Sequence, residues 1–212
     1  MSVHPVQLQG NRLARWLLAC WGWRVDFDGL PALQGIFVVY PHTSNWDFVV
    51  AVMAKWSIGV QLRFWGKDSL FRIPVFGRWL RWIGGIPVDR HVSGGLVGQA
   101  IDAFSNAKSN NTYFWLGLSP EGTRKKAPGW RSGFYKTAVQ ANVPVCLVKL
   151  DFAQRHIDAT HFLELSGDEN VDINRIAAVF LNVKGCIPEN ATPVVFMADK
   201  TTPRAPTSYT LQ

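Results

Sequence analysis

The sequence predicts a single α/β domain with a central, mostly parallel or mixed sheet flanked by helices. From about residue 36 onward, apolar runs of strand length alternate with longer segments of helical periodicity, which is typical of layered α/β folds. The 212 residues are enough for one domain with a substantial core, and they contain neither repeats nor a linker. We therefore expect a short amphipathic N-terminal helix within residues 1–24, the main domain over 25–200 and a loose tail over 201–212.

The elements expected in chain order follow the apolar pattern. A strand at 36–39 is indicated by a short β-branched run after Pro31 and Gly35, and a core helix at about 44–57 follows it. The remaining pattern predicts strands at 61–65, 112–116, 143–148, 162–165 and 194–196, an amphipathic segment at 69–82, an extended piece at 86–88, and helices at 94–107, 131–141 and 172–182.

The chain is basic and rich in tryptophan. It has 22 Lys and Arg against 15 Asp and Glu, together with 10 Trp. This composition fits an anionic partner, which charge alone leaves open among a phosphorylated substrate, an anionic membrane surface and nucleic acid. The three cysteines are widely spaced and form neither a zinc pattern nor a disulfide framework, so we expect a reducing compartment and no metal.

No apolar run approaches the ~18–20 residues that a membrane-spanning helix needs. The nearest, Leu13 to Trp23, is too short and lacks a small-residue cleavage site, so we expect no signal peptide. Its three Trp and its flanking arginines suit a helix that lies in the membrane interface. A helix packed on the domain is the alternative.

The segment after the first strand carries two residues suited to acid–base chemistry. Ser44 and Asp47 have the spacing of a capping box, so a helix begins here. His42 then lies at the strand exit and Asp47 in the first helical turn, and both can face the carboxyl edge of the sheet, where α/β proteins bind ligands. The imidazole can accept a hydroxyl proton while the carboxylate fixes its tautomer. Alternatively, Asp47 only caps the helix and His42 is a turn residue.

Two polar clusters follow later strands. The loop 117–129 is long for a compact domain, and such loops are more often functional than accidental. It places an acid beside a flexible backbone at Glu121-Gly122 and three cations at Arg124-Lys125-Lys126, which suit phosphate. Asp89-Arg90-His91 follows the extended piece. A solvated loop is the alternative for both clusters.

The order of these segments resembles the glycerophospholipid acyltransferase family, typified by 1-acylglycerol-3-phosphate acyltransferase. The family's His-x-x-x-x-Asp motif is present at 42–47, its Gly-x-Ile-x-Val-x-Arg at 84–90, its Pro-Glu-Gly-Thr-Arg at 120–124 and its Val-Pro-Val at 143–145. Residues 66–71 also resemble the segment ahead of the second motif. Ser119 replaces the family's usual Phe, and the fourth motif lacks a second Pro, which leaves acceptor and chain-length selectivity open.

The resemblance implies roles for the motif residues. His42 would be the general base that takes the acceptor's hydroxyl proton, and Asp47 would orient it. The substrate-binding set would be Lys67, Arg90, Glu121, Gly122, Thr123 and Arg124, with the cations on the anionic head of the acceptor. An acyl-CoA or acyl carrier protein thioester would be the co-substrate, with no bound cofactor and no metal.

The implied function is acyl transfer to a lysophospholipid, above all 1-acylglycerol-3-phosphate, giving phosphatidic acid. The expected partners are the acceptor, the thioester donor and an anionic membrane surface rather than nucleic acid, with the protein cytoplasmic and peripherally bound to the inner face of the membrane. A different hydroxylated lipid, such as a lyso-amino-acid lipid, could replace the acceptor. A thioester hydrolase would use the same motifs, whereas a non-catalytic binder of anionic membranes or nucleic acid leaves the His-Asp spacing unexplained.

Overall fold

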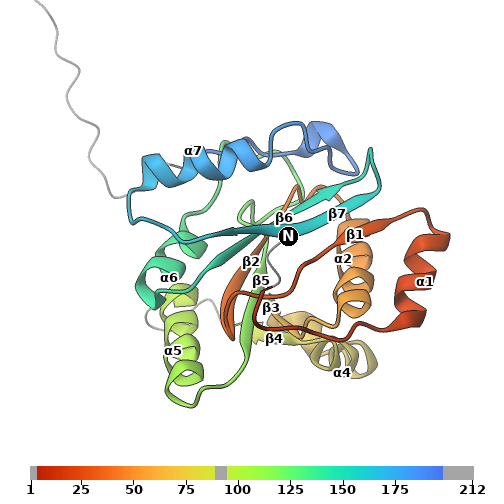
Figure 1. Cartoon of the computed structure of the whole chain (residues 1–212), viewed down its shortest axis with the longest axis horizontal. Coiled ribbons are helices and arrows are strands. Elements are labelled where there is room, and N and C mark those ends of the chain that lie inside the picture. The colour runs from red at the N-terminus through yellow and green to blue at the C-terminus, as the bar shows by residue number, and fades with distance from the viewer. Residues whose placement is uncertain (1–3, 89–94, 198–212) are drawn as a thin grey trace, which may run out of the picture.

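A mixed β-sheet lies between two layers of helices in the computed structural model, which describes residues 4–88 and 95–197 (Figure 1). The strands are β1 (Arg24–Asp26), β2 (Gln34–Tyr40), β3 (Leu62–Lys67), β4 (Gly85–Val88), β5 (Phe114–Leu118), β6 (Val145–Asp151) and β7 (His156–Leu163). The helices are α1 (Arg12–Cys20), α2 (Asn45–Ile58), α3 (Asp68–Phe71), α4 (Pro74–Trp82), α5 (Gly95–Ser109), α6 (Gly133–Ala141) and α7 (Glu169–Val179), followed by the short 3-10 helix η1 (Pro188–Asn190).

The strand order in the described sheet is β1-β7-β6-β2-β5-β3-β4. The strands from β6 to β4 are parallel to their neighbours, whereas β7 is antiparallel to β6 and β1 is parallel to β7. The carboxyl ends of β6, β2, β5, β3 and β4 therefore share one edge. This confirms the predicted α/β class and its mixed sheet.

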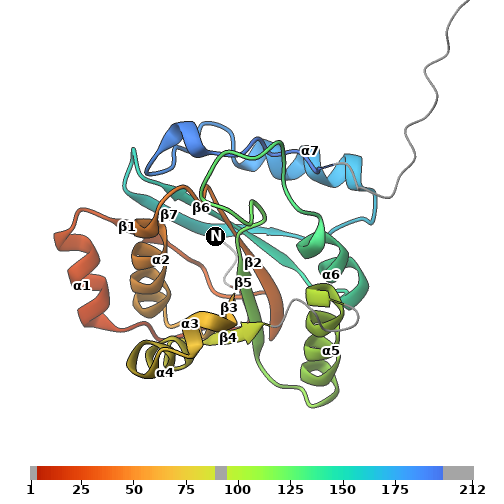
Figure 2. The same ribbon diagram turned by 180° about the vertical axis from the view of Figure 1, so that it is seen from behind.

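Alternate residues of β2 enter two different apolar cores, as the period of two of a strand requires. Ile36, Val38 and Tyr40 pack against α5, α6 and α7. Phe37 packs on the other face, in a core that includes residues of α1 and α2. Figures 1 and 2 show the two helical layers on opposite sides of the sheet, with α1 outside α2.

The neighbouring strands β2 and β5 send their helices to opposite faces. The chain leaves β2 into α2 on one face, and it leaves β5 through a long loop into α6 on the other (Figures 1 and 2). Such a switch point opens a crevice between the two strand exits, and ligands of open α/β sheets bind there. It brings the loop after residue 40 and the loop after residue 118 together.

Several elements differ from the sequence predictions. β1 is not among the predicted strands, and β7 begins at His156 rather than at residue 162, because its first half alternates with polar residues that find partners within the sheet. The segment 69–82 is divided into α3 and α4, since Pro74 starts a new helix. The expected strand at 194–196 is only a single bridge between Phe196 and Trp130.

The predicted N-terminal amphipathic helix is present as α1. Asn11 caps it by accepting the amides of Leu13 and Ala14. Only Ala14 and Leu18 are buried, so most of the helix's apolar surface is exposed. None of the described helices is long and apolar enough to cross a bilayer.

Candidate active site

His42 and Asp47 form the predicted pair at the exit of β2. The Nδ1 atom of His42 lies 3.1 Å from Oδ2 of Asp47. The His42 side chain is 25% exposed and that of Asp47 is 3% exposed. No described residue forms a hydrogen bond with Nε2 of His42, whereas Nδ1 is engaged by Asp47.

Asp47 is held in place by the start of α2. The same oxygen that meets His42 accepts the amides of Thr43 and Ser44, the latter at 2.7 Å. The predicted capping box is present, and the Ser44 hydroxyl also accepts the amide of Trp46 at 3.2 Å. Capping thus fixes the carboxylate, and the carboxylate fixes the imidazole tautomer with its proton on Nδ1. The helix cap and the dyad therefore use the same carboxylate at once.

Glu121 joins the loop after β5 to the backbone of the dyad. It is 2% exposed, its Oε2 accepts the amide of His42, and its Oε1 accepts the amide of Thr192 at 3.0 Å. Burial raises the pKa of Glu121 above its ordinary value, and the bonds from Thr192 and His42 oppose that shift. The side chain therefore points into the protein and connects two loops.

The other predicted binding residues lie at the same edge, as far as they are described. Gly122 has φ +64°, a conformation that favours glycine, and a Cβ there would meet Nε of Arg131 at 2.9 Å. Thr123 and Arg124 are exposed, and no described residue pairs with Arg124. Lys67 is the last residue of β3, at the same edge, whereas Arg90 lies outside the described residues.

Thr192 belongs to the site and was missed by the sequence interpretation. It is fully buried and binds Glu121, although 71 residues separate the two in the chain. A single threonine beside a proline carries no motif or periodicity, so the sequence alone offered no signal for it.

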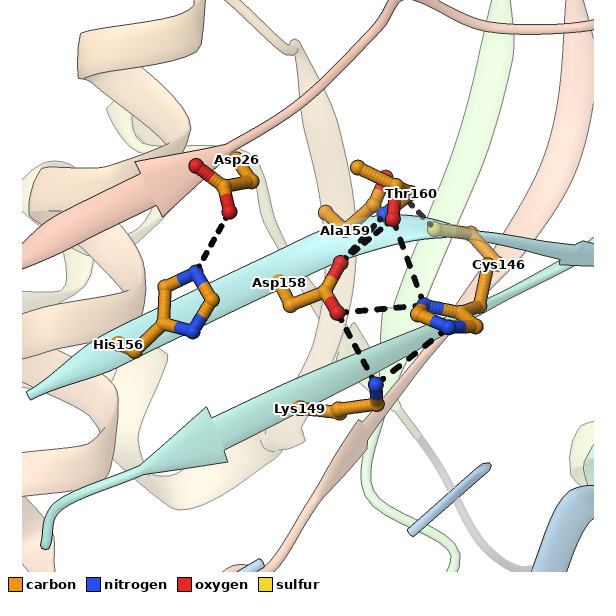
Figure 3. A network of polar contacts seen from close by, with 8 residues as sticks. Asp26, Cys146, Lys149, His156, Asp158, Ala159 and Thr160 are labelled. Atoms are coloured by element: carbon orange, nitrogen blue, oxygen red, sulfur yellow. Dashed lines mark hydrogen bonds and ion pairs between the residues drawn. The ribbon is translucent and has the colours of Figure 1, made fainter. Parts of the chain in front are cut away.

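A second polar network lies on β6, β7 and β1 (Figure 3). Nζ of Lys149 lies 3.0 Å from Oδ2 of Asp158, whose Oδ1 accepts the Thr160 hydroxyl at 2.7 Å. Nε2 of His156 lies 2.8 Å from Oδ2 of Asp26. The Lys149–Asp158 pair thus joins β6 to β7 at their irregular register, and the His156–Asp26 pair joins β7 to β1. We assign both pairs to the pairing of these strands.

Cys146 adjoins this network but is not a reactive thiol. It is 0% exposed and its Sγ contacts the carbonyl oxygen of Ala159 at 3.6 Å. Burial raises the pKa of the Cys146 thiol well above its ordinary value, which disfavours the thiolate needed for nucleophilic attack.

The chain belongs to the Acyltransferase family, whose model matches residues 24–150. It is therefore an acyltransferase by class, and the match spans the dyad and the loop after β5. The crystal structure of the 1-acyl-sn-glycerophosphate (LPA) acyltransferase PlsC from Thermotoga maritima has 18% sequence identity and a TM-score of 0.49, over 78% of this chain and 73% of that chain. A search of curated proteins gave no match.

Proposed function

We propose that this acyltransferase moves an acyl group from a thioester to the hydroxyl of a lysophospholipid, with 1-acylglycerol-3-phosphate as the acceptor. The observation that carries the proposal is Nε2 of His42, which bonds to none of the residues that the structure describes, at an edge where Arg124, Lys125 and Lys126 are exposed on the facing loop. A base beside a cluster of cations suits a hydroxyl borne by a phosphorylated molecule.

The reaction follows from the hydrogen bonds of the dyad. Nε2 of His42 takes the proton of the acceptor hydroxyl as its oxygen attacks the thioester carbonyl carbon, and Asp47 stabilises the imidazolium. The C–S bond then breaks, and His42 returns the proton to the departing thiolate. An ester and a free thiol result, and the enzyme is restored.

A membrane surface is the proposed source of the acceptor. α4 exposes Val75 by 83% and Trp82 by 73%, and α1 exposes Leu13 and Trp16. A groove of about 870 Å³ lies between these helices and α2, and the described residues that line it include Lys55 and Arg63 but no acidic residue. Aromatic and basic residues in this combination suit anionic lipid headgroups.

This surface reaches the catalytic edge through Trp46. Trp46 precedes Asp47 directly, is 55% exposed, and its ring lies 5.8 Å from that of Trp21 at the end of α1. A bilayer that met α1 and α4 would therefore border the crevice. We propose peripheral binding at the cytoplasmic face of the membrane, with an acyl-CoA or acyl carrier protein thioester as donor and no bound cofactor.

The decisive assay offers both donors to the purified protein, with lysophosphatidic acid as acceptor in anionic vesicles. Transfer by the wild type that His42→Ala abolishes would support the base and the acceptor together. Transfer only to a monoacylglycerol or a lyso-amino-acid lipid would show that the acceptor is that lipid and not 1-acylglycerol-3-phosphate. Thioester cleavage unaffected by any lipid would support a hydrolase instead.

The phosphate preference is tested by Arg124→Gln. We expect the variant to raise KM for lysophosphatidic acid and to leave KM for a monoacylglycerol unchanged, because only the first carries phosphate. Lys108→Gln is the matched control, since Lys108 lies at the end of α5, away from the carboxyl edge. Equal effects of Arg124→Gln on both acceptors would remove the phosphate contact from the proposal.

A further inference from the structure

The segment 184–197 runs across the exits of β2 and β5, beyond the part of the chain that the family model matches. The hydroxyl of Thr43 accepts the amide of Ile187 at 3.1 Å, beside the dyad. Further on, the amide of Trp130 donates to the carbonyl oxygen of Val195 at 2.6 Å, at the end of the loop after β5. The segment thus contacts both loops that form the crevice.

Thr192, at the middle of this segment, is bonded by each of its polar groups to a different part of the site. Its amide donates to Oε1 of Glu121 at 3.0 Å, and its hydroxyl accepts the amide of Ala127 at 3.1 Å. Its carbonyl oxygen accepts the Tyr40 hydroxyl at 3.0 Å. Burial raises the pKa of Tyr40 to about 12, so that hydroxyl keeps its proton.

Glu121 extends this connection to the general base. Its second oxygen accepts the amide of His42, so Thr192, Glu121 and His42 form one chain of hydrogen bonds. The three bonds of Thr192 lie out of water, since the residue is 0% exposed. Buried bonds of this kind hold their partners tightly, because a partner left unpaired there cannot turn to solvent.

We propose that Thr192 is a positioning residue, which fixes the loop 119–130, and Arg124 with it, against the His42–Asp47 pair. The proposal rests on the acyl transfer proposed above. Thr192 acts through Glu121 and Ala127 and does not touch a substrate. Reacting groups must be aligned closely, and a displacement of about 1 Å can cost about 10²-fold in rate.

The test compares Thr192→Val, which keeps the shape but removes the hydroxyl, with Thr192→Ser, which keeps the hydroxyl. We expect Thr192→Val to lower kcat/KM for the acceptor by about 10- to 100-fold at unchanged KM for the donor. Thr192→Ser should stay close to the wild type. Thr137→Val is the matched control, because Thr137 is also buried and its hydroxyl donates to Gly133 within its own helix.

Tyr40→Phe tests the placement of Thr192 through a second hydrogen bond, the one that its carbonyl oxygen accepts from Tyr40. It removes the hydrogen bond to the Thr192 carbonyl oxygen without changing the shape of the ring, so it should fold even if Thr192→Val does not. We expect a several-fold loss of kcat/KM. Full activity in folded Tyr40→Phe and in Thr192→Val, or equal losses in Thr192→Val and Thr192→Ser, would overturn the proposal.

Amide hydrogen exchange gives a readout that needs no substrate. Exchange over residues 119–131 should rise in Thr192→Val and keep its wild-type rate in Thr192→Ser and Thr137→Val. Unchanged exchange in Thr192→Val would overturn the proposal. Raised exchange in a protein that acylates no lysophospholipid would reject the proposed function while supporting the placement of the loop by Thr192.

Discussion

The two helical layers that cover the sheet differ in how their side chains are satisfied. The layer of α6 and α7 finds partners for its polar groups inside the chain: Asp172 is fully buried and accepts the Tyr135 hydroxyl at 3.1 Å and the Ser166 amide at 2.7 Å. α1 and α4 instead bury narrow stripes and expose large apolar side chains. These are Leu13, Trp16 and Leu17 on α1, and Val75, Phe76, Trp79 and Trp82 on α4.

α1 and α4 thus expose more large apolar side chains than α6 and α7, of which Val139 and Val171 are exposed. Extended apolar surface is unusual on a soluble monomer, and we propose that α1 and α4 are the helices that meet the membrane. The catalytic edge lies between the two layers. Chemistry, surface binding and folding should therefore respond to different substitutions, and the following predictions test that separation.

The largest effect is expected from His42→Ala. Loss of the general base should lower kcat by about 10²- to 10⁴-fold, measured as acyl transfer from thioester to lipid hydroxyl. Sedimentation with anionic vesicles should be unchanged, because His42 lies at the crevice rather than on the outward faces of α1 and α4. Loss of vesicle binding in His42→Ala as well would show that acyl transfer and surface binding are not separate, and it would contradict the proposed difference between the crevice and the outward faces of α1 and α4.

Val75→Ser combined with Trp82→Ser should separate surface binding from chemistry. Both side chains are mostly exposed, so folding should be unaffected. Loss of their apolar surface should weaken partition onto anionic vesicles by about 10- to 100-fold. Transfer to a short-chain acceptor in free solution should persist.

The matched control for this double variant is Val171→Ser with Leu181→Ser. These residues are also exposed, by 50% and 72%, but they lie on and just after α7. Equal weakening of vesicle binding by both double variants would show that the two layers do not differ in the way proposed.

The smallest effect concerns the layer of α6 and α7. Asp172→Asn should lower the free energy of unfolding by about 1–3 kcal/mol at neutral pH, measured by urea denaturation, and leave transfer by the folded protein unchanged. Asp168→Asn is the control, because Asp168 caps α7 and Asn caps helices equally well. A fall in activity below the unfolding transition would contradict this prediction.

The stabilisation by Asp172 has a defined pH dependence. Burial raises the pKa of Asp172, but the hydrogen bonds from Ser166, Tyr135 and Arg175 outweigh it and hold that pKa below its ordinary value of 3.8. The carboxylate therefore stabilises the fold above that ordinary pKa, and this contribution is lost as the pH falls through the lowered pKa. The difference in unfolding free energy between wild type and Asp172→Asn should accordingly narrow in acid.

The dyad could be predicted from sequence because its geometry is local. Asp47 follows His42 within one turn and the start of a helix, and a strand exit before a capped helix leaves little freedom in how the two meet. The direction of Glu121 could not be predicted in the same way. A polar loop residue is expected to face solvent, yet this one is buried by partners from two distant segments.

Sequence alone therefore determined the α/β class, the order of the main strands and helices, and the His42–Asp47 pair, since apolar period and capping act between near neighbours. Only the tertiary structure decided that Thr192 supports the loop after β5, that β7 extends to His156, and that α1 and α4 leave apolar faces exposed. These features depend on which segments meet across the sheet, and no local pattern encodes such contacts.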